Sequence, residues 1–236
     1  MQLAHFYHCY AAGRWREAVA EHMCVLASTK FDGAFAVGLV GPQSACSEAL
    51  REITGAFRAP DATFQSDRGF EQVTLAPLRQ FARDATELGA GDSAVFYAHT
   101  KGAGNYGPWQ AAWRRSMEQD VFVRRNDFLP ALADHDVAGP HWLTPEKFKL
   151  PAGAHFSGNF WAARCDYLAR LDPVPTNTRH DAEWWIGSGN PRTIDLHSGW
   201  PFGVGRTTPI MHRHFANTEA LNAWKAEVAA SPNRRR

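Results

Sequence analysis

Three polar residues, His99, Thr100 and Lys101, follow a short apolar run at residues 94–98. The run is rich in Val, Phe and Tyr and has glycines on both sides, which is typical of a buried strand that ends in a loop. In an open α/β sheet, ligands bind outside the carboxyl ends of the strands. A lysine at such an end, followed by the glycine-rich segment 102–107 and the start of a helix, indicates a site for a phosphate-bearing ligand. The alternative is an ordinary strand-to-helix turn that carries a lysine by chance.

Two carboxylates, Asp181 and Glu183, are candidates for acid–base chemistry. A hydroxyl group that attacks a carbon atom needs a base to accept its proton, and a carboxylate can serve as that base. Residues two apart on a helix do not share a face, so we expect one carboxylate to point into a site and the other to point outward. The alternative is that both are helix-cap and surface charges.

A further polar stretch, Ser157-Gly158-Asn159, follows a predicted strand that begins at His155. Gly158 leaves room for a ligand, and the Asn159 amide can both donate hydrogen bonds to sugar hydroxyls and accept them. Trp161 could stack on a sugar face, although a position in the core is an equal interpretation.

The first half of the chain predicts the scaffold that positions these residues. Apolar runs alternate with segments of helical periodicity, which is typical of an α/β fold with a mixed, mostly parallel sheet and helices on both faces. The predicted strands are 3–10, 31–40 and 94–98, with a short one near 62–65, and the helices include 15–26, 75–88 and one from a Ser44 cap to a stop at Gly55. No G-x-G-x-x-G follows the first strand and no Walker lysine loop is present, which disfavours nicotinamide, flavin and P-loop sites.

The segment that begins at Pro108 predicts a helix with one apolar stripe. Tryptophans and a methionine recur there at helical spacing, so the stripe is expected to pack in the core. The charged residues Arg114, Arg115 and Glu118 are expected to face away from it.

Composition narrows the class of protein. The chain has 236 residues, of which 44% are hydrophobic and 21% are charged, so a packed core is expected. A formal net charge of +1 argues against a dedicated nucleic-acid-binding protein. Four scattered cysteines without a C-x-x-C pair indicate reduced thiols rather than a zinc site. The chain shows no apolar membrane span and no signal peptide at its start, so we expect a cytoplasmic protein.

Three blocks stand in a fixed order: Tyr97-Ala-His-Thr-Lys-Gly102, His155-Phe-Ser-Gly-Asn-Phe-Trp161 and Arg179-His-Asp-Ala-Glu-Trp-Trp-Ile-Gly187. Together they resemble a family of bacterial and phage glycosyltransferase-like proteins with the GT-A type of fold. Members of that family carry Y-x-H-T-K-G, S-G-N-F-W and R-x-x-A-E-x-W-I blocks. The resemblance extends from about Leu3 to His197, and Glu71 resembles part of the family's segment ahead of the H-T-K-G strand.

The resemblance implies a GT-A-like, Rossmann-like fold and a transferase whose donor is a nucleotide-diphosphate sugar. One domain, 1–236, would contain a nucleotide-binding half at 1–130, an acceptor-side half at 131–215, and a C-terminal helix and tail at 216–236. The acceptor would be a polysaccharide, a protein or a modified base of phage DNA, in a bacterial cell or a phage-infected host.

A leaving nucleoside diphosphate gains negative charge as the glycosidic bond breaks, and a cation placed in advance stabilises that charge. The usual GT-A pattern holds Mn²⁺ or Mg²⁺ with an Asp-x-Asp pair at this strand end, where the present chain has His99-Thr100-Lys101. Lys101 could supply the positive charge directly, which leaves the need for a divalent cation open.

The candidate residues fall into three groups. Glu183 is favoured as the base, with Asp181 and Lys101 as the other catalytic candidates. The predicted donor-binding residues are His8, Tyr10, His99, Thr100, Lys101, Gly102, Arg164 and His197. The predicted acceptor-binding residues are Ser157, Gly158, Asn159 and Trp161. No metal ligand is assigned, although His212 and His214 are spaced to point the same way from a strand.

Two other functions compete with sugar transfer. One is a non-catalytic GT-A-like module that binds a nucleotide or a carbohydrate, which the missing Asp-x-Asp pair favours. The other is a histidine-based metal hydrolase that uses His99, His155, His197 or His212.

Overall fold

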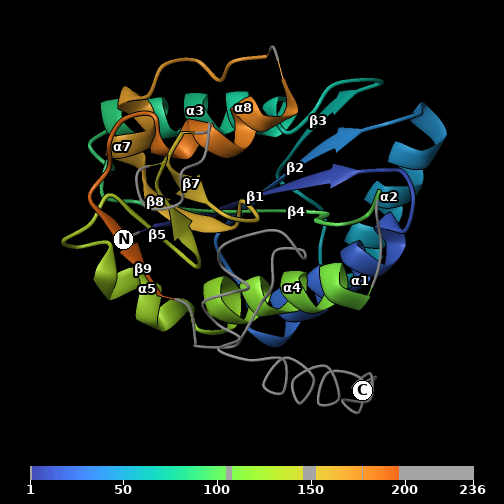
Figure 1. Ribbon diagram of the computed structural model, residues 1–236. Coiled ribbons are helices and arrows are strands. Elements are labelled where there is room, and N and C mark those ends of the chain that lie inside the picture. The colour runs from blue at the N-terminus through green and yellow to red at the C-terminus, as the bar shows by residue number, and fades with distance from the viewer. Residues whose placement is uncertain (1, 105–107, 146–152, 177, 197–236) are drawn as a thin grey trace.

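The computed structural model describes residues 2–104, 108–145, 153–176 and 178–196, and in this part of the chain one sheet separates two layers of helices (Figure 1). The strands of the sheet are β1 (Leu3–Tyr10), β2 (Ala34–Val40), β3 (Ala62–Ser66), β4 (Ala94–His99), β5 (Val137–Gly139), β8 (Trp161–Arg164) and β9 (Thr193–Asp195). A separate two-stranded sheet contains β6 (Trp142–Leu143) and β7 (His155–Phe156).

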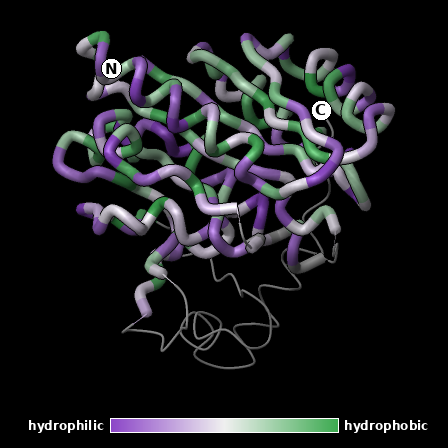
Figure 2. The backbone as a smooth tube through the Cα atoms, turned by 90° about the horizontal axis from the view of Figure 1, so that it is seen from above, coloured by the Kyte–Doolittle hydropathy of each residue, from purple (hydrophilic) through white to green (hydrophobic). Residues whose placement is uncertain are grey.

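The lower layer in Figure 1 contains α1 (Trp15–Ser28), α2 (Gln43–Ala56), α4 (Pro108–Glu118) and α5 (Arg125–Ala131). The upper layer contains α3 (Gln72–Glu87), α7 (Cys165–Arg170) and α8 (Arg179–Trp184). A π-helical turn, Gln119–Val123, follows α4, and a 3₁₀ turn, Trp185–Gly187, follows α8. Hydrophobic and hydrophilic residues alternate along the outer helices, as expected of elements with one buried side (Figure 2). Among the described helices, none is both long and apolar enough to cross a lipid bilayer.

The strand order is β3-β2-β1-β4-β8-β5-β9, and it confirms the predicted mixed, mostly parallel sheet with helices on both faces. β1 pairs in parallel with both β2 and β4, while β8 runs antiparallel to β4 and β5. The chain therefore moves outward from β1 to β3 and then returns to the other side of β1. The loops after β1 and β4 lie at this change of direction, which is where open α/β sheets bind ligands.

The sheet forms because its central strands are apolar almost throughout. Every residue of β4 is buried, and so are the six interior residues of β1. Such runs need cover on both faces, and helical residues such as Val19 and Met23 below and Leu75 and Leu78 above provide it.

Several predicted boundaries are wrong, those of the second strand and the second helix among them. The second strand begins at Ala34 rather than Phe31, because Phe31 still closes the end of α1 by donating its N–H to the Leu26 carbonyl. The second helix has Pro42 at its N-cap position, without a side-chain cap, and it continues through Gly55 to Ala56.

Candidate functional site

The Lys101 side chain lies just beyond the end of β4, between the two layers of helices. Its Nζ atom is 3.5 Å from Oε1 of Glu183, which α8 brings from the upper layer. It is also 4.7 Å from the centre of the Trp113 ring, which α4 brings from the lower layer. The Lys101 and Glu183 side chains are only 12% and 14% exposed. The sequence analysis placed Lys101 and Glu183 in one site, and the geometry brings them together.

Thr100 joins the turn of Lys101 to the neighbouring strand. Its N–H donates to the His8 carbonyl at 2.9 Å, and its Oγ1 accepts from the N–H of Tyr10 at 2.9 Å. The Thr100 side chain is thus buried in the join between β1 and β4, and its predicted contact with the donor stays a prediction. The Tyr10 side chain is 44% exposed at this edge, and its predicted role in donor binding stays a prediction.

His8 and Gly102 both have structural roles within the fold. The buried His8 ring places Nδ1 2.8 Å from Oγ1 of Thr74 on α3, and burial lowers the pKa of His8 to about 4. Gly102 has a φ of 80°, and a Cβ there would lie 2.6 Å from the Cβ of Gln110. Glycine is therefore required for the turn itself, and the predicted donor contacts of both residues stay predictions.

Glu71 is a buried carboxylate beside this site that the sequence analysis left without a role. Its Oε2 accepts hydrogen bonds from the Tyr97 hydroxyl at 2.7 Å and from Nδ2 of Asn159 at 2.6 Å. Burial raises the pKa of the Glu71 carboxyl, and the nearby negative charge of Glu183 acts in the same direction. The only sequence signal for Glu71 was its place in the segment ahead of the H-T-K-G strand.

His99 completes this buried polar group. Its Nε2 is 2.9 Å from the Gly158 carbonyl, and since a carbonyl oxygen can only accept, Nε2 carries a proton. Its Nδ1 faces Oε1 of Glu71 at 3.4 Å. Both nitrogens of His99 therefore face groups of the fold, and its predicted role in donor binding stays a prediction.

The second sequence block packs inside the fold, contrary to the prediction that it binds the acceptor. The Trp161 ring is fully buried and stacks on Tyr97 with ring centres 5.0 Å apart, so the core interpretation of this tryptophan holds. Its Nε1 donates to Oδ1 of Asn159 at 2.8 Å, which fixes the amide so that Nδ2 points to Glu71. Asn159 is fully buried and has no face left for a sugar.

The predicted acceptor-binding roles of Gly158 and Ser157 are corrected for the same reason, because both residues pack inside the fold. Gly158 has a φ of 96°, and a Cβ there would lie 2.3 Å from Sδ of Met117, so the space that glycine leaves is filled by α4. Ser157 is buried, and its N–H donates to the His141 carbonyl at 2.9 Å.

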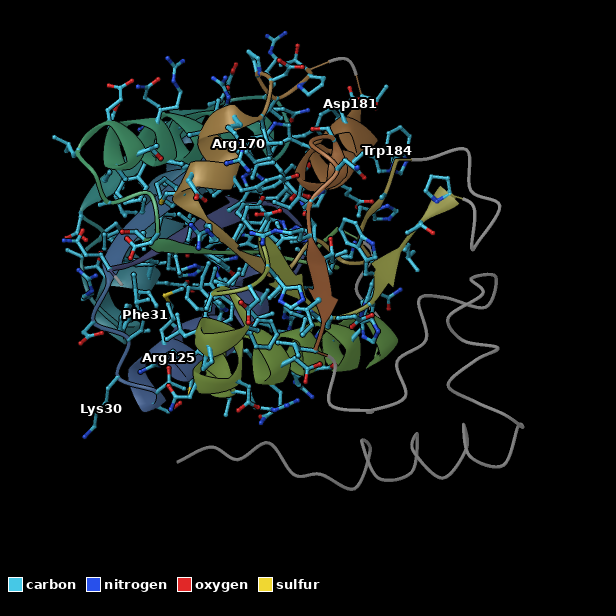
Figure 3. All side chains as sticks on the ribbon, turned by 90° about the vertical axis from the view of Figure 1, so that its left-hand side faces the viewer. Lys30, Phe31, Arg125, Arg170, Asp181 and Trp184 are labelled. Atoms are coloured by element: carbon cyan, nitrogen blue, oxygen red, sulfur yellow. The ribbon has the colours of Figure 1, made fainter. Side chains whose placement is uncertain are left out.

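Asp181 is part of the helix start rather than the site. Thr178 is the N-cap of α8, and Asp181 completes a capping box in which its Oδ2 accepts from the N–H of Thr178 at 2.6 Å. Figure 3 shows Asp181 and Trp184 on α8 in the upper layer, far from Lys30 and Arg125 at the bottom. The cap interpretation of Asp181 therefore replaces its catalytic one.

Arg164 lies at the wrong end of the sheet for donor binding. It pairs with Asp166 at 2.6 Å, and because β8 is antiparallel to β4, Arg164 stands opposite Ala94. His99 lies five positions further along the strand than Ala94, which is about 17 Å. The predicted contact of Arg164 with the diphosphate is thus corrected, and His197, His212 and His214 lie outside the described residues.

Two histidines lie near Glu183. Nδ1 of His180 is 3.7 Å from Oε2 of Glu183, and the His180 ring stacks on Trp184. His155 places Nδ1 2.8 Å from the Gly153 carbonyl, and burial lowers the pKa of His155. In the part of the chain that the structure describes, no three His, Cys, Asp or Glu side chains gather to hold a metal ion, so these residues give the metal-hydrolase hypothesis no support.

A second buried polar group lies below the sheet, where the sequence analysis expected exposed charges. Arg114 and Glu118 on α4 are fully or almost fully buried, while Arg115 is half exposed. Nη1 of Arg114 donates to the Lys101 carbonyl at 3.0 Å, and Nη2 pairs with Glu21 on α1. The prediction that Arg114 and Glu118 face solvent is wrong because α4 packs against both the sheet and α1.

The hydrogen-bond partners of His5 and His22 determine which of their ring nitrogens carry a proton. Nδ1 of His5 is 3.0 Å from the Phe96 carbonyl and must donate, so Nε2 of His5 accepts from Nε2 of His22 at 2.8 Å. Nδ1 of His22 is then an acceptor, and it faces Oε1 of Glu118 at 3.3 Å. Burial raises the pKa of Glu118 to about 8 and lowers the pKa of His22 to about 3, so a protonated, neutral Glu118 faces a neutral His22 in the folded protein.

This assignment predicts how stability changes with pH. Between the ordinary pKa of 4.5 and the folded value of about 8, the folded chain binds one more proton at Glu118 than the unfolded chain. The stability contributed by this proton is complete below pH 4.5 and is lost as the pH rises through 8. In Glu118→Gln, the amide has nearly the same shape as the protonated carboxyl but does not titrate.

The test compares the free energy of unfolding of the two proteins, by urea titration, at several pH values. We expect the wild-type value minus the Glu118→Gln value to fall by up to about 1.4 kcal/mol per pH unit across this range. Arg114 and Arg115 of α4 and Glu21 of α1 face Glu118 in both proteins, so their effects cancel in the difference. Parallel pH curves would show that Glu118 is ionised in the folded protein.

Comparison with known proteins identifies a family. A model of the family described as "Domain of unknown function (DUF8361)" matches residues 6–206. No curated protein matches the chain. A solved structure described as the crystal structure of 4-diphosphocytidyl-2C-methyl-D-erythritol synthase is similar over 84% of this chain and 91% of that chain, with 10% sequence identity and a TM-score of 0.38. A similarity at this level indicates neither a substrate nor a reaction for the present protein.

Proposed function

The chain belongs to the family described as Domain of unknown function (DUF8361), and we propose that this member is a glycosyltransferase that uses a nucleotide-diphosphate sugar as donor. One observation carries the proposal. A lysine and a glutamate form a partly buried ion pair at the carboxyl ends of β1 and β4, where the chain changes direction. Such a position suits an anionic ligand, and the pair offers the two groups that sugar transfer needs.

Lys101 is proposed to bind the diphosphate. The Trp113 ring holds the ammonium from below, so the cation is already placed before a ligand arrives. A diphosphate carries more negative charge than one carboxylate, so its oxygens would displace Glu183 from Lys101. The same ammonium would then stabilise the charge that develops on the leaving diphosphate.

Glu183 is proposed to become the base when Lys101 turns to the ligand. The acceptor hydroxyl attacks the anomeric carbon of the sugar, and the bond from that carbon to the diphosphate oxygen breaks. Glu183 accepts the hydroxyl proton, and the bonding electrons leave with the nucleoside diphosphate. The ion pair in the free protein keeps Glu183 close to the position where the reaction needs it.

The residues at the end of β4 do not fit a divalent cation. His99 uses both ring nitrogens within the fold, and the next side chain at this edge, Lys101, is itself a cation. No step of the proposed reaction therefore passes through a metal ion, and we expect turnover to persist when EDTA removes divalent cations. A loss of activity that Mn²⁺ or Mg²⁺ restores would contradict this proposal.

A donor screen tests the function itself. The protein is mixed with UDP-, GDP- and dTDP-sugars, binding is detected as a thermal shift, and release of the nucleoside diphosphate is measured for each donor that binds. We expect one class of donor to bind and to be hydrolysed slowly in the absence of acceptor. Binding without any hydrolysis or transfer would instead favour a non-catalytic GT-A-like module, and no binding at all would contradict both functions.

A further inference from the structure

The buried Arg114 side chain below the sheet has a role that goes beyond packing. We propose that Arg114 is a positioning residue, which holds the Lys101 turn in the geometry that binds the diphosphate, and that Glu21 holds Arg114. This inference rests on the proposed function for its consequence, although its structural part can be tested without a ligand.

The first step of the inference rests on the contacts of the Arg114 guanidinium. The side chain is fully buried, and its nitrogens face three different elements. Nη1 donates to the Lys101 carbonyl at 3.0 Å, Nη2 pairs with Glu21, and Nε lies 3.9 Å from Oε1 of Glu118. The planar fork of an arginine can bond to the Lys101 carbonyl and to Glu21 at once from two nitrogens in fixed positions, whereas the single ammonium of a lysine lacks that geometry.

The second step of the inference rests on the free-energy cost of burying the charged Arg114 guanidinium. A buried ion pair is rarely worth more to stability than apolar residues of the same volume. The Arg114 guanidinium therefore needs another reason to be in the core. The contact with the Lys101 carbonyl supplies one, because it ties the turn that bears the proposed diphosphate ligand to α1 and α4.

The same network holds β4 at a second point. His5 donates to the Phe96 carbonyl, and His22 links His5 to Glu118. The network thus contacts β4 inside the strand and the turn just beyond its end. Trp113, which packs against the Lys101 ammonium, is the residue before Arg114, so one turn of α4 sets both the backbone and the side chain of Lys101.

The test uses the full chain with Arg114→Lys and a matched control, Arg115→Met. Arg115 pairs with the same Glu21 from the next position of α4, but it is half exposed. Hydrogen exchange of the amides of residues 101–104 is followed by mass spectrometry. The affinity for the nucleoside diphosphate selected by the donor screen is measured by calorimetry.

We expect Arg114→Lys to exchange these amides about tenfold faster and to bind the nucleoside diphosphate about tenfold more weakly, as the loss of one charge-assisted hydrogen bond predicts. Peptides from α2 and β3 should exchange as in the wild type, and Arg115→Met should change neither value. Wild-type exchange at residues 101–104 in Arg114→Lys, or an equal effect of Arg115→Met, would overturn the inference.

Two further variants distinguish a failure of this inference from a failure of the proposed function. If Arg114→Lys does not fold, Glu21→Gln in the Arg115→Met background weakens the support of Arg114 more gently, and faster exchange at residues 101–104 is again expected. Lys101→Met reports on the proposed function: if it binds the nucleoside diphosphate as the wild type does, the function fails. The exchange rates then still decide whether Arg114 positions the turn.

Discussion

Replacing Glu183 with glutamine is expected to stop sugar transfer while the donor still binds. A general base typically contributes 10²- to 10⁴-fold to a rate, so we expect kcat to fall by about that factor. The affinity for the donor should stay the same or increase, because Glu183 competes with the diphosphate for Lys101 in the wild type. Turnover is followed by release of the nucleoside diphosphate, and affinity is measured by calorimetry.

The matched control for this variant is Asp181→Asn, on the same short helix. Asp181 completes the capping box of α8, so its replacement should lower the free energy of unfolding by about 1 kcal/mol but leave kcat almost unchanged. If Glu183→Gln retains wild-type turnover, or if Asp181→Asn loses it, Glu183 is not the base.

Replacing Lys101 with methionine is expected to weaken donor binding and turnover together. Methionine keeps apolar contact with Trp113 but removes the charge. We expect an affinity about 10- to 100-fold lower, as for the loss of a hydrogen bond to a charged group, and a kcat about 10²- to 10³-fold lower. Calorimetry and the donor-release assay measure the two effects separately.

Lys30→Met is the control for the loss of one positive charge. Lys30 is exposed at the bottom of the molecule, away from α8 (Figure 3), so both values should stay at those of the wild type. The contrast between Lys101→Met and Glu183→Gln is diagnostic, because only Lys101→Met is expected to lower the affinity. Equal losses of affinity in both would show that the ion pair only stabilises the fold.

The strands could be predicted well from the sequence because their signal is local. Residues 3–10 form β1 as predicted, and β4 extends the predicted run by one residue. The closeness of Lys101 and Glu183 depends instead on elements 82 positions apart, and the resemblance of the three blocks suggested it.

The buried partners of the second block could not be predicted in this way. Asn159 and Trp161 resemble sugar-binding residues, but Glu71, 88 positions away, uses the Asn159 amide inside the fold. Nothing in a local pattern indicates that a distant carboxylate will fill such a position. The antiparallel direction of β8 could not be predicted from a local pattern either, and it places Arg164 at the opposite end of the strands from His99.

Arg114 and Glu118 show a further limit of periodicity. A helix with one apolar stripe predicts that charged residues opposite the stripe face solvent. α4 contacts both the sheet and α1, so two of its faces are buried, and the second face is charged because it pairs with Glu21 and His22.

A crystal structure of the protein with the nucleoside diphosphate selected by the donor screen tests the central claim most directly. The account predicts phosphate oxygens within about 3 Å of Nζ of Lys101, with Oε1 of Glu183 displaced from that nitrogen and turned toward the sugar side. A diphosphate bound elsewhere, or one bound while Lys101 and Glu183 remain paired as they are in the free protein, would contradict it.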